Sequence, residues 1–463
     1  MRDLSALIKA YDIRGVVPEQ WGPELAREVG VAFVEVLGIR SADGGAGKIV
    51  VGHDMRPTGP DLVAAFIDGA TSAGVDVVNI GLCSTDGLYF ASGTLDIPGA
   101  MFTASHNPAE YNGIKLCRAG AAPVGQDSGL AAIRTLLESE SLPHHDGPHG
   151  SVTHVDMLAD YALFLRKLVP LENGRPLKVV IDTGNGMGGF TVPAVLGDDV
   201  LPALPLDIDA MYFELDGTFP NHEANPIDPE NLRDLQKRVL EVGADIGLAF
   251  DGDADRCFVV DNNGEIVDPS TLTALIASRE LAKVPGATII HNLITSKAVP
   301  EIVTELGGTP VRTRVGHSFI KAKMAESGAI FGGEHSGHFY FREFWNADSG
   351  MLAAMHALAA LGETAEGTKL SDVLSPFVRY VASGEINTTV SDAQAVIAKI
   401  RDAAIANGLA TDELDGLTVS GQDFWYNVRP SNTEPLLRLN CESSTAAGME
   451  SIRDSILSQM KDA

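Results

Sequence analysis

The chain has 463 residues, of which 45% are hydrophobic and 21% are charged, and 62 acidic residues against 34 lysines and arginines give a formal charge of −28. This length exceeds what one hydrophobic core usually serves, so about three or four domains are expected. No apolar run approaches the roughly 20 residues that cross a bilayer, and the negative charge disfavours nucleic acid and anionic membranes as partners.

Cysteine spacing and the N-terminal sequence bear on the compartment. The cysteines are scattered without a CxxC pair, which argues against both a zinc knuckle and a disulfide framework. The N-terminus lacks the apolar segment of a secretory signal, so we expect reduced thiols and a cytoplasmic protein. An anionic small substrate remains compatible with the acidic composition, because the net charge describes the electric field far from the protein and not the field inside a cleft. The cysteines are Cys83, Cys117, Cys257 and Cys441.

Strand-like and helix-like runs alternate from the N-terminus onward, which is typical of a sheet-centred α/β layer. Near the start, residues 10–15 place Tyr11 and Arg14 close together, and either side chain could be structural. After the polar, His- and Gly-rich stretch 143–150 the pattern restarts, so a domain boundary is predicted near residue 150. The predicted helices cover residues 23–37 and 60–73, and the predicted strands cover residues 48–51 and 75–80.

A serine loop, Thr103-Ala104-Ser105-His106-Asn107-Pro108, follows the apolar run 99–102. Ser105 is a hydroxyl nucleophile that a substrate could reach there, although a serine taken alone is more often part of a simple turn. The dipeptide Asn112-Gly113 predicts a tight turn that would return Lys115 to the same cleft, where it could contact phosphate or shuttle a proton.

The second unit begins with a predicted strand over 177–182, which leads into the glycine-rich segment 184–189. That segment has neither a Gly-Lys-Ser/Thr sequence nor GxGxxG spacing, so we interpret it as packing or a turn. A third unit follows, and the last ninety or so residues form a smaller α+β domain. Helices are predicted over 271–283, 297–306 and 392–406 and at the C-terminus, and strands over 287–290, 310–315, 384–390, 424–428 and 436–440.

Three alternating carboxylates, Asp251, Asp253 and Asp255, follow the strand-like run 246–250. Acidic groups this close repel one another unless a cation neutralises them. An EF-hand loop would need glycine at its sixth position and glutamate at its twelfth, and the chain has Arg256 and an asparagine there. A solvated acidic turn is the remaining alternative, and Mg²⁺ is the cation that such a small carboxylate set suits best.

Two loops in the third unit concentrate polar side chains. Residues 332–338 contain Glu334 and Ser336, which would point the same way if the segment is extended and could bind sugar hydroxyls. A metal site at His335 and His338 lacks an evident third ligand in the sequence. His317 stands where a strand meets a helix, and it is either an ordinary loop histidine or a proton carrier for a sugar hydroxyl.

The last unusual loop spans residues 429–435, where a guanidinium, hydroxyls, an amide and backbone N–H groups can surround a phosphate dianion. A plain turn would explain its prolines but not its arginine. The phosphate ligands expected here are Arg429, Ser431, Asn432 and Thr433.

With these motifs in order, the chain resembles the α-D-phosphohexomutases, and within them the bacterial phosphomannomutase/phosphoglucomutase group. The resemblance implies an α/β fold of three topologically similar domains with mixed sheets plus a C-terminal α+β lid domain around a central cleft. The expected domains are 1–150 with the phosphoserine loop, 151–262 with the metal loop, 263–372 with the sugar-binding loop, and 373–463 with the phosphate-binding loop.

The resemblance also implies a mechanism in which phospho-Ser105 and a hexose 1,6-bisphosphate intermediate exchange a phosphoryl group between the 1- and 6-positions of a hexose phosphate. Glucose or mannose 1,6-bisphosphate would be the activator, and Mg²⁺ would bind Ser105 and the three aspartates. Arg14 and Arg256 would assist, and Lys115 and His317 both remain candidates for proton transfer. Substrate contacts are implied for Tyr11, Glu334, Ser336, His338, Arg429, Ser431, Asn432 and Thr433.

Sugar preference is only partly indicated. Asn432 and Ala254 resemble the phosphomannomutase/phosphoglucomutase pattern, whereas His335 stands where many members of that group have methionine. Phosphoglucosamine mutase and a non-catalytic sugar-phosphate-binding protein are the alternatives. A monomer or weak homodimer is expected, with hexose phosphates as substrates and neither nucleic acid nor membrane as a partner.

Overall fold

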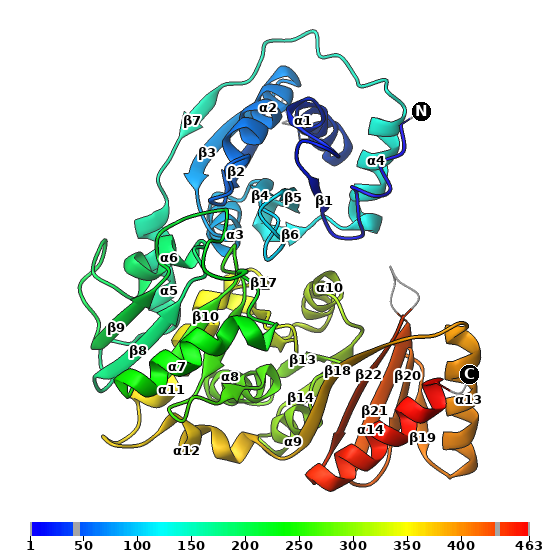
Figure 1. Cartoon of the computed structure of the whole chain (residues 1–463). Helices are drawn as coiled ribbons and strands as arrows, with labels where there is room; N and C mark the ends of the chain where they lie inside the picture. The colour runs from blue at the N-terminus through cyan, green and yellow to red at the C-terminus, as the bar shows by residue number, and fades with distance from the viewer. Residues whose placement is uncertain (1, 40–46, 431–435, 462–463) are drawn as a thin grey trace. The chain divides into compact units, whose positions relative to one another are not determined.

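The computed structural model describes residues 2–39, 47–430 and 436–461. Two compact units are present, one of Met1–Val267 with Ser336–Val373 and one of Asp268–His335 with Leu374–Ala463. Helices and strands alternate along the chain in three α/β domains with mixed sheets, followed by a C-terminal α+β domain with an antiparallel sheet, as expected (Figure 1).

The first sheet mixes parallel and antiparallel neighbours. Its strands are β1 (Ile13–Val16), β2 (Lys48–His53), β3 (Asp76–Leu82), β4 (Gly99–Phe102), β5 (Tyr111–Arg118), β6 (Ala122–Pro123) and β7 (Val152–His154). They follow the order β1-β5-β4-β2-β3-β7, with β6 beside β5. Strands β4, β2 and β3 are parallel, whereas β5 runs antiparallel to β4 and β1. The accompanying helices are α1 (Pro23–Leu37), α2 (Gly59–Ser72), α3 (Thr85–Leu95) and α4 (Leu130–Glu138).

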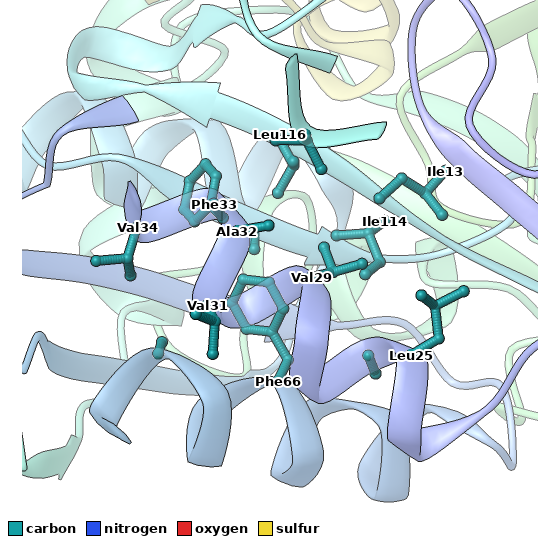
Figure 2. Close-up of a cluster of buried hydrophobic side chains, with 14 of the residues drawn as sticks. Ile13, Leu25, Val29, Val31, Ala32, Phe33, Val34, Phe66, Ile114 and Leu116 are labelled. Atoms are coloured by element: carbon teal, nitrogen blue, oxygen red, sulfur yellow. The ribbon is translucent and has the colours of Figure 1, made fainter. Parts of the chain in front are cut away.

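Helix α1 packs its apolar face on the core of this domain (Figure 2). Leu25, Val29 and Phe33 are spaced four residues apart, so they lie on one side of the helix and are all buried. Phe66 of α2 joins them and meets the ring of Phe102 edge to face, with 5.4 Å between centroids. Each such side chain stabilises the fold by about 1.5–3 kcal/mol through burial.

The second sheet repeats the central strand arrangement of the first sheet, β5-β4-β2-β3. Its strands are β8 (Leu177–Asp182), β9 (Leu206–Met211), β10 (Ile246–Phe250), β11 (Cys257–Val260) and β12 (Ile266–Val267), with helices α5 (Leu158–Leu168), α6 (Gly188–Val195) and α7 (Arg233–Val242). The order is β12-β11-β10-β8-β9, with β10, β8 and β9 parallel and β11 antiparallel to β10. The turn between β10 and β11 is the predicted metal loop.

The third domain has strands in both units. In the second unit, β13 (Thr288–Asn292) runs parallel to β14 (Thr309–Thr313) and β15 (Phe331–Gly333). In the first unit, β16 (Phe339–Phe341) and β17 (Ala347–Asp348) form an antiparallel pair. The helices of this domain are α8 (Pro269–Lys283), α9 (Ala298–Glu305), α10 (His317–Ser327), α11 (Gly350–Gly362) and α12 (Leu370–Leu374).

The C-terminal sheet is entirely antiparallel. Its strands are β18 (Val381–Thr389), β19 (Ala410–Asp412), β20 (Leu417–Ser420), β21 (Phe424–Pro430) and β22 (Leu436–Ser443), in the order β18-β22-β21-β20-β19. Helices α13 (Ala393–Ala406) and α14 (Ala446–Lys461) share one hydrophobic core with these strands, through residues such as Ile400, Val428 and Ile456.

Most predicted elements are confirmed. The helix expected over 23–37 is α1, and the strand expected over 177–182 is β8. All four cysteines are buried and unbridged, as their scattered spacing predicts. Across the described residues, no helix is both long and apolar enough to span a membrane.

The predicted Asn-Gly turn is wrong. Asn112 and Gly113 lie inside β5, where Gly113 pairs with Arg14 of β1. A Cβ on Gly113 would lie only 2.4 Å from the carbonyl oxygen of Ile13 and 2.8 Å from that of Thr103. The glycine therefore allows a close approach between backbones, and it is the strand itself that carries Lys115 to the site.

Candidate active site

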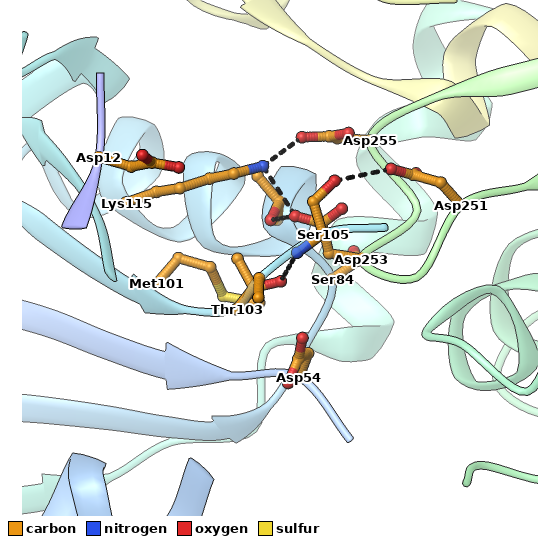
Figure 3. A network of polar contacts seen from close by, with 12 residues as sticks. Asp12, Asp54, Ser84, Met101, Thr103, Ser105, Lys115, Asp251, Asp253 and Asp255 are labelled. Atoms are coloured by element: carbon orange, nitrogen blue, oxygen red, sulfur yellow. Dashed lines mark hydrogen bonds and ion pairs between the residues drawn. The ribbon is translucent and has the colours of Figure 1, made fainter. Parts of the chain in front are cut away.

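Ser105 lies in the loop after β4 with a left-handed backbone, φ 50°. Its N–H donates to Thr103 Oγ1 at 2.8 Å, and its hydroxyl donates to Asp251 Oδ2 at 2.9 Å (Figure 3). Arg256 Nη2 donates to the same hydroxyl at 3.2 Å. Ser105 is only 4% exposed, because neighbouring charged side chains surround it.

The three predicted metal ligands converge in the turn after β10. Asp251, Asp253 and Asp255 are at most 1% exposed, and one carboxylate oxygen from each lies within 4.8 Å of the others. Among the described residues, Asp253 Oδ1 and Asp255 Oδ1 are buried without a hydrogen-bond partner. Buried carboxylate oxygens without donors suit a hard divalent cation, so the site fits Mg²⁺.

The metal loop and the serine loop touch through their backbones. A Cβ on Gly252 would lie 2.4 Å from the Ser105 carbonyl oxygen, so only glycine allows this approach. The glycine-rich segment 184–189 forms a turn before α6, and the N–H of Met187 donates to the Gly252 carbonyl at 2.8 Å. The interpretation of that segment as packing or a turn is confirmed.

Lys115 and Arg256 supply the positive charge in the cluster. Lys115 Nζ donates to Asp253 Oδ2 at 2.7 Å and to Asp255 Oδ2 at 2.6 Å (Figure 3). Burial works against the charged amine, but these two carboxylates outweigh it and hold the pKa of Lys115 well above its usual value. Arg256 Nη2 lies 2.7 Å from Asp251 Oδ2.

The aspartates respond differently to this environment. Burial raises the pKa of Asp251 above its ordinary value, although Arg256 opposes the rise. Burial acts in the same direction on Asp253, but Lys115 outweighs it, and the pKa of Asp253 stays below its usual range. Asp251 therefore holds its negative charge less readily than Asp253 does.

Thr85 at the start of α3 is a contact that sequence reasoning missed. Its hydroxyl donates to Asp253 Oδ2 at 2.6 Å, and its N–H donates to the Asp253 carbonyl at 3.0 Å. The two residues are 168 positions apart. A threonine at a helix start signals only a cap, so local sequence offers no sign of this role.

His106 was also missed, although it follows Ser105 directly. Its Nδ1 lies 3.3 Å from the Ser105 hydroxyl and accepts a hydrogen bond from Arg256 Nη2. Burial, followed by the charges of Arg256 and Arg14, lowers the pKa of His106 to about 2. The ring is therefore neutral near pH 7 and acts as an acceptor.

Arg14 reaches the serine loop from β1. It donates to Asn107 Oδ1 at 2.6 Å and to the Ala104 carbonyl at 3.3 Å, and it pairs with Asp12 at 2.5 Å. Tyr11 precedes this pair and is partly buried. The structure thus brings Arg14 to the loop that carries Ser105.

His338 gains acidic neighbours that the sequence does not reveal. Its Nε2 lies 3.7 Å from Asp255 Oδ1 and 4.0 Å from Asp348 Oδ2, and its Nδ1 is hydrogen-bonded to Ser336 Oγ at 2.9 Å. His338, Asp255 and Asp348 lie close enough together to hold a metal ion, a set that the sequence did not suggest. His335 lies in the other unit, 3.8 Å from Asp268.

Glu334 and Ser336 do not share an extended segment. Strand β15 ends at Gly333, and the chain turns at residues 335–336. Glu334 is 2% exposed and accepts from the N–H of Gly316 at 3.2 Å and from Asn292 Nδ2 at 3.3 Å. The segment is therefore not extended between these two residues, so the condition under which their side chains would point the same way is not met.

The remaining predicted residues lie in the second unit. His317 begins α10, and its side chain lies outside the described structure. Arg429 of β21 donates to Glu385 Oε2 at 2.7 Å, with 12% of its side chain exposed. Ser431, Asn432 and Thr433 lie outside the described residues.

Comparison with known proteins identifies the class. Family models for phosphoglucomutase/phosphomannomutase match in four segments: alpha/beta/alpha domain I at residues 5–144, domain II at 154–264, domain III at 268–380 and the C-terminal domain at 385–459. The chain belongs to the phosphoglucomutase/phosphomannomutase family.

Individual relatives span almost the whole chain. It is 39% identical to a phosphomannomutase of Salmonella montevideo over 94% of both chains, and 37% identical to a phosphomannomutase/phosphoglucomutase of Pseudomonas aeruginosa over 99% of this chain and 96% of the other. A solved family structure from Burkholderia thailandensis superposes with a TM-score of 0.87 at 32% identity, covering 99% of this chain and 97% of that one.

Proposed function

We propose that this chain is a phosphohexomutase that moves a phosphoryl group reversibly between the 1- and 6-positions of mannose and glucose phosphates. The observation that carries the proposal is the Ser105 hydroxyl, hydrogen-bonded to Asp251 at the edge of a buried three-carboxylate cluster. The names of the Salmonella and Pseudomonas relatives support the two sugars.

The proposed reaction has two balanced half-steps. The free hydroxyl oxygen of a hexose phosphate attacks the phosphorus of phospho-Ser105, the bond from phosphorus to Ser105 Oγ breaks, and the hydroxyl proton passes to a base. The resulting hexose 1,6-bisphosphate turns over and returns its other phosphoryl group to Ser105 Oγ, while a proton is given back to the sugar oxygen. The enzyme ends phosphorylated, as it began.

Mg²⁺ would be held by Asp251, Asp253 and Asp255 together with one oxygen of phospho-Ser105. There it would offset the charge of the phosphoryl group during transfer. The unsatisfied carboxylate oxygens support this assignment. Arg256 reaches Ser105 Oγ directly and would stabilise the charge that develops there, while Arg14 would keep the loop in place.

Proton transfer has two candidates, Lys115 and His317. The two ion pairs of Lys115 favour its protonated form, so we propose that it donates a proton and balances charge more readily than it accepts a proton. His317 would then be the acceptor.

Substrate contacts are proposed for the third and fourth domains. Glu334 offers a buried carboxylate to sugar hydroxyls, and Arg429 offers a guanidinium to the distal phosphate. The further proposed ligands are Tyr11, Ser336, His338, Ser431, Asn432 and Thr433. We propose the domain limits 1–150, 151–262, 263–372 and 373–463, with the last domain as the lid.

The test is an assay of the purified chain on mannose 1-phosphate, glucose 1-phosphate and glucosamine 1-phosphate, with Mg²⁺ and glucose 1,6-bisphosphate. Phosphorus NMR would follow the products, and intact-mass measurement would follow the state of Ser105. Conversion of mannose 1-phosphate and of glucose 1-phosphate to their 6-phosphates, with one phosphoryl group on Ser105, supports the proposal. Turnover without that ester, or a marked preference for glucosamine phosphate, overturns it.

A further inference from the structure

The loop that carries Ser105 is held by a buried arginine that has no part in the reaction scheme above. Arg56 lies just beyond β2 and is 1% exposed, which is rare for a charged side chain of this size. Three of its five side-chain acceptors are carbonyl oxygens of the serine loop, and a fourth is the carbonyl of Tyr111 at the start of β5.

Every N–H of the Arg56 guanidinium has an acceptor. Nε donates to Asp54 Oδ2 at 3.2 Å, and each Nη donates twice. A guanidinium has five N–H donors in a fixed plane, so this set uses all of them. The four carbonyl acceptors are Pro108 and Tyr111 at 2.8 Å, Ser105 at 2.9 Å and Asn107 at 2.7 Å.

These contacts bear on the direction of the Ser105 hydroxyl. Ser105 has a positive φ of 50°, a conformation that a residue with a Cβ adopts only when its surroundings hold it there. Thr103 Oγ1 fixes the N–H of Ser105, and Arg56 fixes its carbonyl. With both flanking peptides fixed, the hydroxyl is aimed at Asp251.

The charge of Arg56 is balanced locally by Asp54. Asp54 is fully buried, accepts from both the Nε and the backbone N–H of Arg56, and forms an ion pair with it. Phe219 covers the guanidinium, with 5.3 Å from its carbon to the ring centroid. The contribution of Arg56 is therefore geometric.

We propose that Arg56 is a positioning residue for phosphoryl transfer, which binds three carbonyls of the Ser105 loop and the carbonyl of Tyr111 and so holds Oγ beside the metal cluster. The inference rests on the proposed mutase function. It concerns how the backbone of the Ser105 loop is held and does not involve the residues proposed to contact the substrate.

Arg166 provides a matched control. It is also buried, at 6% exposure, and it also gathers loop carbonyls, but in the segment 195–202. Arg56→Lys and Arg166→Lys both keep the charge and lose the planar fork. Arg166 Nε, Nη1 and Nη2 donate to the carbonyls of Val195 at 2.8 Å, Pro202 at 2.5 Å and Gly197 at 2.7 Å.

The first measurement is steady-state kinetics on the full chain with glucose 1-phosphate, glucose 1,6-bisphosphate and Mg²⁺. We expect Arg56→Lys to lower kcat by about 100-fold with KM within about three-fold of wild type, because misplacing a reacting group acts on the chemical step. Arg166→Lys should keep both constants within about three-fold. Equal losses of kcat in the two variants, or an unchanged kcat in Arg56→Lys, would overturn the proposal.

The second measurement is amide hydrogen exchange, which does not depend on activity. Arg56→Lys should speed exchange in residues 103–112 and not in 195–202, and Arg166→Lys should do the reverse. If the wild type has no mutase activity, the proposed function fails while this exchange result still tests the clamp. If the wild type is active and residues 103–112 exchange at the wild-type rate in Arg56→Lys, the clamp is refuted alone.

Discussion

Charged side chains are held in opposite ways at the Ser105 centre and on the C-terminal sheet. At the centre, Asp251 and Asp253 are fully buried and contact Arg256 or Lys115. On the sheet, Arg429 and Arg438 share Glu385 with side chains that are 12% to 32% exposed. Removing one partner at the centre leaves a buried charge without a counter-charge. On the sheet, water can take the place of a removed partner.

This difference matches two chemical tasks. A phosphoryl transfer site gains from charges that need no rearrangement during reaction, and burial with fixed partners provides that. The phosphate-binding role proposed for Arg429 requires it to exchange one anion for another, and its partly exposed pair with Glu385 suits a ligand that arrives and leaves. The variants below test this contrast, in order of decreasing expected effect.

Ser105→Ala should reduce mutase activity by at least about 10⁴-fold, because the covalent step loses its nucleophile. The melting temperature should stay close to that of the wild type, since the hydroxyl is one small polar group. Steady-state kinetics and a thermal melt check both expectations. Retention of more than a few per cent of activity would exclude the covalent role.

Lys115→Met should destabilise the metal-free protein by about 3–5 kcal/mol, because Asp253 and Asp255 would be left buried without their cation. Mg²⁺ should recover much of this loss by neutralising the same carboxylates. Urea unfolding in EDTA and in Mg²⁺ measures the difference.

The control for that variant is Lys237→Met, whose i,i+4 pair with Glu241 on α7 is exposed. Its unfolding midpoint should match the wild type in both buffers. An equal loss in Lys115→Met with and without Mg²⁺ would argue against a shared metal and lysine site.

Arg429→Ala should raise KM for hexose phosphates by about ten-fold and leave kcat within about three-fold, because it removes a binding contact and no chemical group. Its stability should change by less than about 1 kcal/mol, as for other ion pairs that water can reach. Kinetics with both sugar phosphates test this. A fall in kcat at constant KM would contradict the phosphate-binding role.

His222 is an intermediate case between the buried charges of the Ser105 centre and the more exposed charges of the C-terminal sheet. Burial alone would lower the pKa of His222, but its hydrogen bond to Asp182 at 3.0 Å and the charge of that carboxylate raise it above its ordinary value of about 6.5. The raised pKa stabilises the fold below about pH 6.5, and this contribution is lost as pH rises through the folded-state pKa.

The wild-type melting temperature should therefore fall more between pH 6 and 8 than that of His222→Gln. Thermal melts across this range, in one buffer series at constant ionic strength, provide the comparison. Parallel curves for the two proteins would show that the Asp182 pair does not titrate with folding.

Periodicity along the chain was enough to predict where the main elements lie. The four-residue spacing of Leu25, Val29 and Phe33 predicts α1, and a continuous apolar run predicts β8, because both patterns reflect burial of one element on a neighbouring layer. The motifs around Ser105 and Asp251 could be found in the same way, since small loops after buried strands keep their chemistry within a few residues.

Tertiary structure alone decided which distant residues meet. Lys115 reaches Asp253 through the register of β5 with β4, and not through the Asn-Gly turn that local sequence suggested. Arg56, just beyond β2, contacts the Ser105 loop, and His338 lies close to Asp348 and Asp255. Local sequence encodes periodicity and turn chemistry, whereas strand register and the packing of separate loops are set only when the whole sheet forms.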